Sequence, residues 1–170
     1  MHAHHSNIDY LESAMASLEV ELVHFVDPVL IYRMTQDKRF SEVEALAKIK
    51  MQLVWIASCD VDTILITCTN MIAVLKDEQL SIEIPIIKID EPYFEVICRE
   101  QQPQILIFTN SATVAGTIER LQEYAKLHEK TIDIEIKVIE NTFELLMQGK
   151  GKEYNTAILQ FYMKQYKESR

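Results

Sequence analysis

Short runs of hydrophobic residues alternate along the chain with longer segments whose apolar residues recur every three or four positions. Runs of about five residues are typical of buried strands, and the longer segments are typical of amphipathic helices. The predicted strands cover residues 20–26, 63–67, 84–89, 104–108 and 131–139. The predicted helices cover residues 6–17, 28–34, 41–58, 93–101, 113–126, 143–147 and 152–167, and a further helix begins at residues 69–70. Strands that alternate with helices over short connections predict parallel sheets covered by helices, which is an α/β fold.

The pattern divides the chain into two α/β halves of similar size. The turn Asp90-Glu91-Pro92 separates residues 1–91 from residues 92–170, and no low-complexity linker lies there. Each half has one strand fewer than we expect for a stable sheet. The first half enters a helix almost at once, and the last helix of the second half is followed by no strand. We therefore expect either a fragment of a longer protein, or a partner such as a second copy in a homodimer that covers the open sheet edges.

Composition narrows the classes of function. The chain has 170 residues, of which 48% are hydrophobic, and its net charge is −9. This acidic balance argues against a nucleic-acid partner bound through a basic surface. No apolar run approaches the roughly 20 residues of a membrane span, and the N-terminus lacks the apolar region of a signal peptide. We therefore expect a cytoplasmic protein with neither a membrane nor a nucleic acid as partner.

Cysteine and glycine usage excludes further classes. Neither a zinc-site spacing nor a pairing framework can be drawn from the three cysteines, Cys59, Cys68 and Cys98, which fits a reducing compartment. The glycine-rich motifs of dinucleotide sites and P-loops cannot be drawn from the three glycines, Gly116, Gly149 and Gly151. The sequence therefore gives no indication of a nucleotide site, a disulfide scaffold or a zinc site.

Cys68 is the candidate catalytic residue. It follows the predicted strand 63–67, and the next helix begins over Thr69 and Asn70. A thiol at the carboxyl end of a strand faces the amino end of the following helix, whose N–H groups and dipole favour the thiolate over the thiol. The alternative is that Cys68 packs in the core as a small hydrophobic residue.

A second loop of similar composition follows the predicted strand 104–108. It carries hydroxyl and amide side chains ahead of a helix, namely Thr109, Asn110, Ser111 and Thr113. Ligands of open parallel sheets bind outside the carboxyl ends of the strands, and neutral donors of this kind suit a carboxylate. Helix capping is the alternative explanation for either loop. Two such loops, one of them beside a cysteine, favour a site for a small acid.

The remaining candidates are interpreted as structural. Cys59 lies at a predicted helix end and Cys98 within a helical face, so both are predicted to be packing residues. His24 lies inside the predicted strand 20–26, where we expect a satisfied core histidine. The N-terminal histidines are interpreted as a flexible run rather than a metal cluster: His2, His4 and His5.

Five segments of the chain resemble the aspartate/glutamate/hydantoin racemase superfamily. They occur in the order and at the approximate spacing of that family, and they cover nearly the whole chain: LVHFVDPVLI at 22–31, DTILITCTNM at 62–71, IPIIKIDEP at 84–92, ILIFTNSATV at 105–114 and ENTFELLMQGKGKEYN at 140–155. Cys68 followed by hydroxyl and amide residues is the most specific part of the resemblance.

The resemblance implies a fold and a chemistry. In this family two flavodoxin-like halves with parallel sheets face each other across a cleft. A cysteine from each half acts on the α-carbon of the substrate, and no cofactor is used. The resemblance implies that Cys68 is one catalytic cysteine of the pair. It also implies that the substrate carboxylate is held by Thr69, Asn70, Thr109, Asn110, Ser111 and Thr113.

The chain departs from the family pattern at three places. The usual Cys-Asn-Thr or Cys-Asn-Ser triplet is Cys68-Thr69-Asn70 in this sequence. The first strand of the family is missing or reduced to Met1-His2-Ala3. The strand that carries the second catalytic residue is expected beyond Arg170, and no other cysteine of the chain takes that role.

Three hypotheses of function follow. The first is a racemase or isomerase that moves a proton at the α-carbon of a small carboxylic acid or amino acid. The second is a decarboxylase or isomerase of the same superfamily that uses one cysteine. The third is a truncated or degenerate module that binds a small carboxylate without turnover. If the chain is an enzyme, we expect iodoacetamide at neutral pH to react with Cys68 faster than with Cys59 or Cys98.

Overall fold

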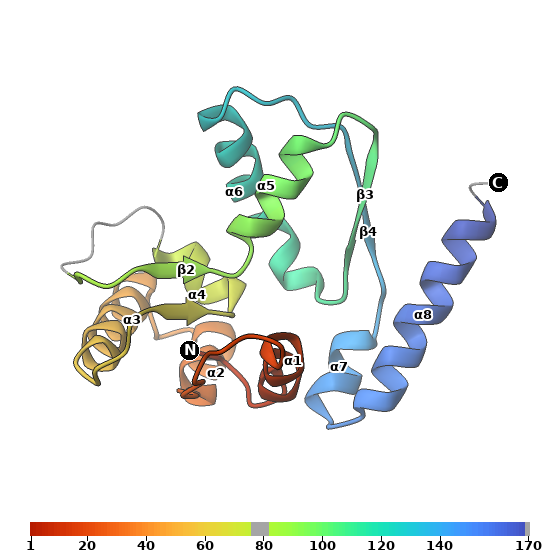
Figure 1. Cartoon of the computed structure of the whole chain (residues 1–170). Coiled ribbons are helices and arrows are strands. Elements are labelled where there is room, and N and C mark those ends of the chain that lie inside the picture. Colours follow the sequence, from red (N-terminus) through yellow and green to blue (C-terminus); the bar gives the residue numbers. More distant parts are fainter. Residues whose placement is uncertain (76–81, 169–170) are drawn as a thin grey trace. The chain divides into compact units, whose positions relative to one another are not determined.

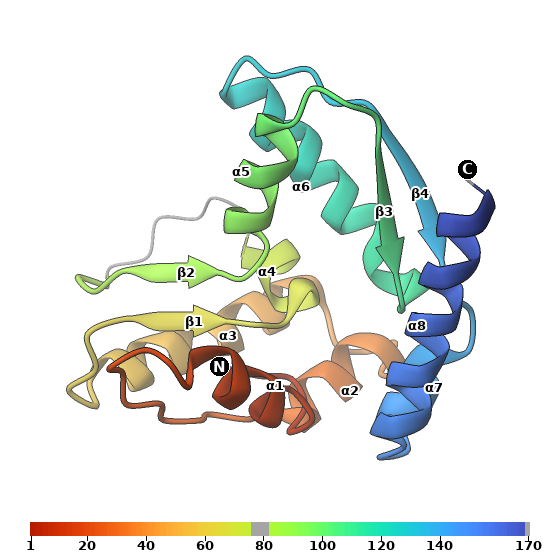
Figure 2. The same cartoon turned by 45° about the vertical axis from the view of Figure 1, so that its right-hand side comes forward.

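The computed structural model of the chain describes residues 1–75 and 82–168. It is an α/β structure in which helices accompany two small parallel sheets, so the predicted fold class is confirmed at this level. The chain forms two compact units, Met1–Val96 and Ile97–Arg170, and Figures 1 and 2 show their elements.

The first unit is built around one pair of parallel strands. Strand β1 (Ile64–Ile66) pairs with β2 (Ile86–Lys88), with Ile64 opposite Ile86 and Ile66 opposite Lys88. The helices of this unit are α1 (Asn7–Met15), α2 (Pro28–Gln36), α3 (Glu42–Ala57) and α4 (Thr69–Leu75), and α5 (Glu91–Arg99) continues into the second unit. The predicted strands 63–67 and 84–89 are present as these shorter strands.

The N-terminal residues lie beside β1 and extend the sheet. Met1 N donates to Leu65 O at 2.7 Å, and Thr67 N donates to Met1 O at 3.1 Å. On the other side, His2 N donates to Phe25 O at 2.8 Å and Asp27 N donates to His2 O at 3.0 Å, so that His2 bridges Val26 in parallel. Residues Met1 and His2 therefore link β1 to the segment that ends at Asp27.

The predicted strand over residues 20–26 is wrong. Of that stretch, only Val26 takes part in strand pairing, through its bridge to His2. Val20 and Val23 are 54% and 76% exposed, although the apolar run predicted that they would be buried. The N-terminal segment supplies a pairing partner only at the end of the stretch, so the alternating pattern ahead of it is not used in a sheet.

The core of the first unit lies between the sheet and the helices. Its fully buried side chains come from α3, β1 and α4: Ile49, Leu53, Ile66, Met71 and Ile72. Met1, Leu30, Ile64, Cys68 and Leu75 join the same cluster. Apolar spacing in α3 and α4 thus places one face of each helix on this sheet.

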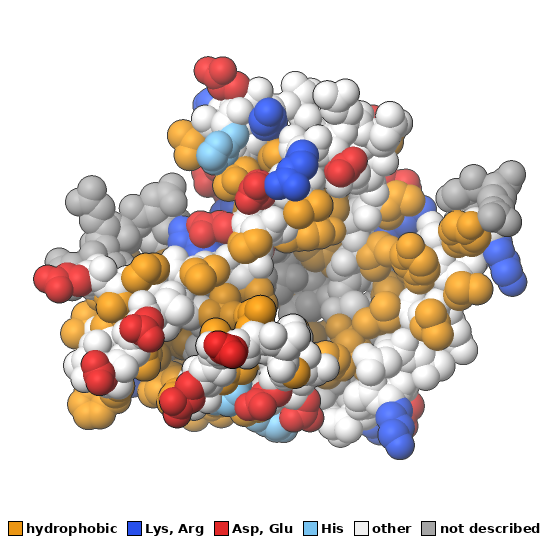
Figure 3. All heavy atoms as spheres, in the orientation of Figure 1, with side chains coloured by type: hydrophobic (Ala, Val, Ile, Leu, Met, Phe, Trp, Pro, Cys, Tyr) orange, Lys and Arg blue, Asp and Glu red, His pale blue; other side chains and the backbone are white. Residues whose placement is uncertain are grey.

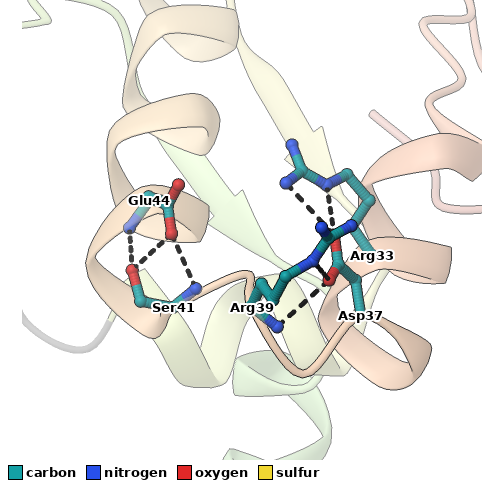
Figure 4. Close-up of polar contacts among 5 residues, drawn as sticks. All are labelled: Arg33, Asp37, Arg39, Ser41 and Glu44. Carbon is teal, nitrogen blue, oxygen red and sulfur yellow. Dashed lines mark hydrogen bonds and ion pairs between the residues drawn. The ribbon is translucent and has the colours of Figure 1, made fainter.

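Polar contacts define the connection from α2 to α3 (Figure 4). Ser41 and Glu44 form a capping box, in which Glu44 N donates to Ser41 Oγ and Ser41 N donates to the Glu44 carboxylate. This confirms Ser41 as the start of the long helix. Asp37 accepts hydrogen bonds from Arg39 N and from the Arg33 side chain, and these lower the pKa of its carboxyl group.

The second unit contains the other parallel pair. Strand β3 (Gln104–Phe108) has the predicted bounds and pairs with β4 (Ile134–Val138) over its full length. The short 3₁₀ helix η1 (Ser111–Thr113) leads into α6 (Val114–Leu127), and α7 (Thr142–Met147) is followed by α8 (Gly151–Glu168). Leu106 of β3 and Leu121 and Ala125 of α6 are buried.

Helix α8 carries an exposed apolar stripe. Its members recur at helical spacing and each is about half exposed or more: Leu159, Tyr162, Met163 and Tyr166. Figure 3 shows hydrophobic side chains gathered along this helix. Among the helices that the structure describes, none is long and apolar enough to cross a membrane.

Candidate functional site

Cys68 lies where the sequence places it, at the turn between β1 and α4. Its side chain is only 8% exposed and belongs to the core cluster of the first unit. The backbone N–H groups of Asn70 and Met71, in the first turn of α4, donate to its sulfur. Thr69 and Asn70 begin α4 and are half-buried beside it. The structure thus brings together the candidate residues of the first loop.

Burial decides the protonation state of this thiol. Removal of the sulfur from water raises the pKa of Cys68 above its usual value, and the hydrogen bonds from Met71 and Asn70 only oppose that rise. The expectation that the start of the helix makes Cys68 a thiolate is therefore wrong for this structure, because the desolvation of the charged form outweighs the two N–H groups. At neutral pH Cys68 is a protonated thiol.

The other two cysteines differ in exposure, and all three thiols are free. Cys59 is exposed, and its thiol donates to Trp55 O at 3.3 Å, so it is not the packing residue that the sequence predicts. Cys98 is 8% exposed on α5, and burial raises the pKa of its thiol. Its packing role is confirmed.

A chain of hydrogen bonds joins Thr67, the residue before Cys68, to the protein surface. Thr67 Oγ1 lies 3.0 Å from His2 Nδ1, and His2 Nε2 lies 3.0 Å from His24 Nδ1. His24 Nε2 in turn lies 3.0 Å from Oε1 of the exposed residue Glu12 on α1. Asn7 Nδ2 donates to Thr67 Oγ1 at 3.1 Å. We call these five residues the histidine relay.

His2 is the buried member of the histidine relay. His2 is only 2% exposed, and burial lowers the pKa of its imidazole to about 4. The Met1 amino group and His24 lower this pKa further by smaller amounts. His2 is therefore neutral at physiological pH, with one ring nitrogen that donates and one that accepts. Burial also lowers the pKa of the Met1 amino group to about 6.

Sequence reasoning missed the histidine relay. The flexible run that the sequence suggests for the N-terminal histidines is wrong for His2, which is paired with Val26 and buried. His24 was expected in a strand, yet it lies outside any strand, half-buried between His2 and Glu12. One signal was available, because the alternation of His2 and His4 with Ala3 is compatible with an extended segment. Among the described residues, no group of three or more His, Cys, Asp or Glu side chains could hold a metal ion.

The second candidate loop lies in the second unit, between β3 and α6. Asn110 Oδ1 accepts from Ala112 N at 3.0 Å, which caps η1, and Thr113 Oγ1 donates to Asn110 O at 2.9 Å. Thr109 Oγ1 lies 3.3 Å from the hydroxyl of Tyr154 on α8, and Ser111 is exposed. Helix capping therefore accounts for Asn110, and a turn contact accounts for Thr113. The proposed role of this loop in carboxylate binding stays a prediction.

Comparison of the chain with models of known protein families, with curated proteins and with solved structures found no match. The racemase-like pattern of the sequence therefore stays a resemblance.

Alkylation separates the three cysteines. Because Cys59 is exposed and Cys68 is a buried, protonated thiol, iodoacetamide should modify Cys59 first at pH 7, which reverses the order expected from the sequence. The rate at Cys68 should rise as the pH is raised toward 10. Mass spectrometry of peptides from the native protein after timed labelling measures both rates. Faster labelling of Cys68 than of Cys59 at pH 7 would contradict the protonated, buried state.

His2 should make the stability of the protein depend on pH. The unfolded chain takes up a proton on His2 near its ordinary pKa of about 6.5, whereas the folded chain does so only near pH 4. The free energy of unfolding should therefore fall as the pH falls from about 7 toward 4, by on the order of 1–3 kcal/mol from this group.

The variant His2→Gln tests this dependence, because glutamine does not titrate. Urea unfolding at several pH values should give a flatter pH profile for His2→Gln than for the unchanged protein, whatever the absolute stability of the variant. His5→Gln, which replaces an exposed histidine, is the matched control and should keep the original profile. Equal slopes for all three proteins would show that His2 is not held neutral by the fold.

Proposed function

We propose that this protein is a cofactor-independent isomerase-like protein of the racemase type, which moves a proton at the carbon next to the carboxylate of a small acid or amino acid. The observation that supports the proposal is the position of Cys68 at the carboxyl end of β1, with the N–H groups of Asn70 and Met71 directed at its sulfur. Those N–H groups stabilise the thiolate that remains when the thiol gives up its proton.

The chemistry assigned to Cys68 begins from the protonated thiol. A carbanion next to a carboxylate takes the proton of the Cys68 S–H group, so that a C–H bond forms, the S–H bond breaks and a thiolate is left. Racemisation needs a second group that removes the α-proton from the opposite face. The proposal leaves that second group unassigned in this chain.

The raised pKa of Cys68 favours the one-cysteine form of this chemistry as a second candidate. In a decarboxylase of this type, carbon dioxide leaves the substrate and its bonding electron pair stays on the α-carbon. The buried thiol then protonates that carbon, and no base is needed to start the reaction. A resting thiol is the form that this sequence of steps requires, whereas α-proton removal by Cys68 requires the thiolate.

The remaining parts of the proposal come from the sequence. They are two flavodoxin-like halves that face each other across a cleft and a substrate carboxylate held by hydroxyl and amide groups of both loops: Thr69, Asn70, Thr109, Asn110, Ser111 and Thr113. Homodimer formation and a cytoplasmic location belong to the same proposal. The opposing hypothesis, a module that binds a small carboxylate without turnover, uses the same residues but not the Cys68 proton.

Exchange into deuterated water tests the proposal. The protein is incubated with amino acids, a hydantoin and 2-substituted malonates, and proton NMR follows deuterium at the α-carbon and loss of carbon dioxide. Turnover of one of these substrates is expected, and Cys68→Ser should lower its rate by about 100-fold or more, since a serine hydroxyl is a much weaker proton carrier at neutral pH.

Cys59→Ser is the matched control, because it removes an exposed thiol of the same unit, and it should keep the full rate. Equal rates for Cys68→Ser and the unchanged protein would overturn the role of Cys68. An absence of exchange and of decarboxylation with all of these compounds would favour the module that only binds.

A further inference from the structure

The carboxylate of Glu12, at one end of the histidine relay, determines which atom donates in each of the hydrogen bonds from Glu12 to Thr67. Glu12 presents a carboxylate, so His24 Nε2 carries the proton that it donates there. With both imidazoles neutral, His24 Nδ1 is then an acceptor and His2 Nε2–H donates to it. His2 Nδ1 is left as an acceptor for the hydroxyl of Thr67. All the protons of the neutral relay therefore point from Thr67 toward Glu12.

A second arrangement satisfies the same atoms after one proton is added. When His24 is protonated on both nitrogens, its Nδ1–H donates to His2 Nε2, and His2 must carry its own proton on Nδ1. That proton is donated to Thr67 Oγ1, so the Thr67 hydroxyl turns to another acceptor. Met1 O lies 3.4 Å from Thr67 Oγ1 and supplies it. No heavy atom has to change its partner between the two arrangements, apart from this last bond.

The charges around the two imidazoles select His24 as the residue that takes up the proton. The carboxylate of Glu12, on α1, faces His24 Nε2 and stabilises an imidazolium there. The amino group of Met1, on the same segment as His2, opposes a charge on His2. His2 is also buried, whereas His24 is half-buried and closer to water.

We propose that the histidine relay is a proton switch, in which uptake of one proton by His24 reverses the hydrogen bonds of His2 and Thr67. His2 changes its tautomer and stays neutral, and the Thr67 hydroxyl changes its acceptor from His2 Nδ1 to Met1 O. Through the switch, protonation of His24 changes the hydrogen bonds of Thr67, the residue that precedes Cys68. It goes beyond the proposed function and does not depend on Cys68 being catalytic.

Reversal changes how Thr67 bonds to its neighbours. In the neutral arrangement its hydroxyl donates to His2 Nδ1, and its oxygen accepts from Asn7 Nδ2. In the protonated arrangement the oxygen accepts from both His2 Nδ1–H and Asn7 Nδ2, and the hydroxyl donates to Met1 O. Thr67, the residue before Cys68, therefore changes from donor to acceptor toward His2.

Nitrogen NMR of the histidine rings tests the switch. In ¹⁵N-labelled full-length protein, long-range proton–nitrogen spectra distinguish a ring nitrogen that carries a proton from one that does not. At pH 8 both His2 and His24 should carry the proton on Nε2. As the pH falls to 5, His24 should become protonated on both nitrogens while His2 moves its single proton to Nδ1, with the same pH midpoint. His2→Gln and His24→Gln assign the signals.

Either of two results would overturn the switch. The first is a His2 ring that keeps its proton on Nε2 throughout this pH range, and the second is a His2 ring that becomes an imidazolium before His24 does.

Glu12→Gln provides a second test that leaves the core intact, because Glu12 is exposed. Loss of the carboxylate removes the charge that faces His24 Nε2, so the shared midpoint should move to lower pH. Glu19→Gln removes an equal charge at another exposed position and should leave the midpoint in place. Equal shifts in the two variants would contradict the specific contact between Glu12 and His24.

Discussion

The first unit depends on the pairing of two N-terminal residues with segments far away in the chain. Met1 exchanges two backbone hydrogen bonds with Leu65 and Thr67, and His2 exchanges two with Phe25 and Asp27. A net contribution of about 0.5–1.5 kcal/mol for each such bond makes the four together significant beside a typical stability of 5–15 kcal/mol. This segment supplies backbone hydrogen bonds that link the carboxyl end of β1 to the start of α2.

Burial at this junction explains why three titratable groups of the unit have shifted pKa values. Packing of the N-terminal segment buries Met1, His2 and Cys68. It thereby removes an amino group, an imidazole and a thiol from water. Each group therefore prefers its neutral form, so Cys68 keeps its proton and His2 stays without a charge. A neutral His2 can serve as both donor and acceptor, so it connects Thr67 to His24 and Glu12 through hydrogen bonds. The protonation of the junction is thus a consequence of how tightly the N-terminal segment is packed.

Local sequence patterns predicted the elements that local interactions determine. The apolar spacing of α3, its cap at Ser41, and the strand Gln104–Phe108 all follow from neighbouring residues, and the structure contains them. The failures concern partners far apart in sequence. The apolar run over residues 20–26 pairs only at Val26, and His2 is buried where Phe25 and Thr67 contact it. Periodicity cannot report such contacts, and it cannot weigh desolvation of Cys68 against the N–H groups of α4.

Native-state hydrogen exchange of individual amides tests the central role of the N-terminal segment most directly. The amides of His2, Asp27 and Thr67 donate to Phe25, His2 and Met1. They should exchange as slowly as the amides of Ile64 and Ile89, which donate within the pairing of β1 and β2, because all five belong to one cooperative unit. Exchange of His2 and Thr67 at the rate of an unstructured peptide, while Ile64 stays protected, would show that the first unit folds without its N-terminal residues.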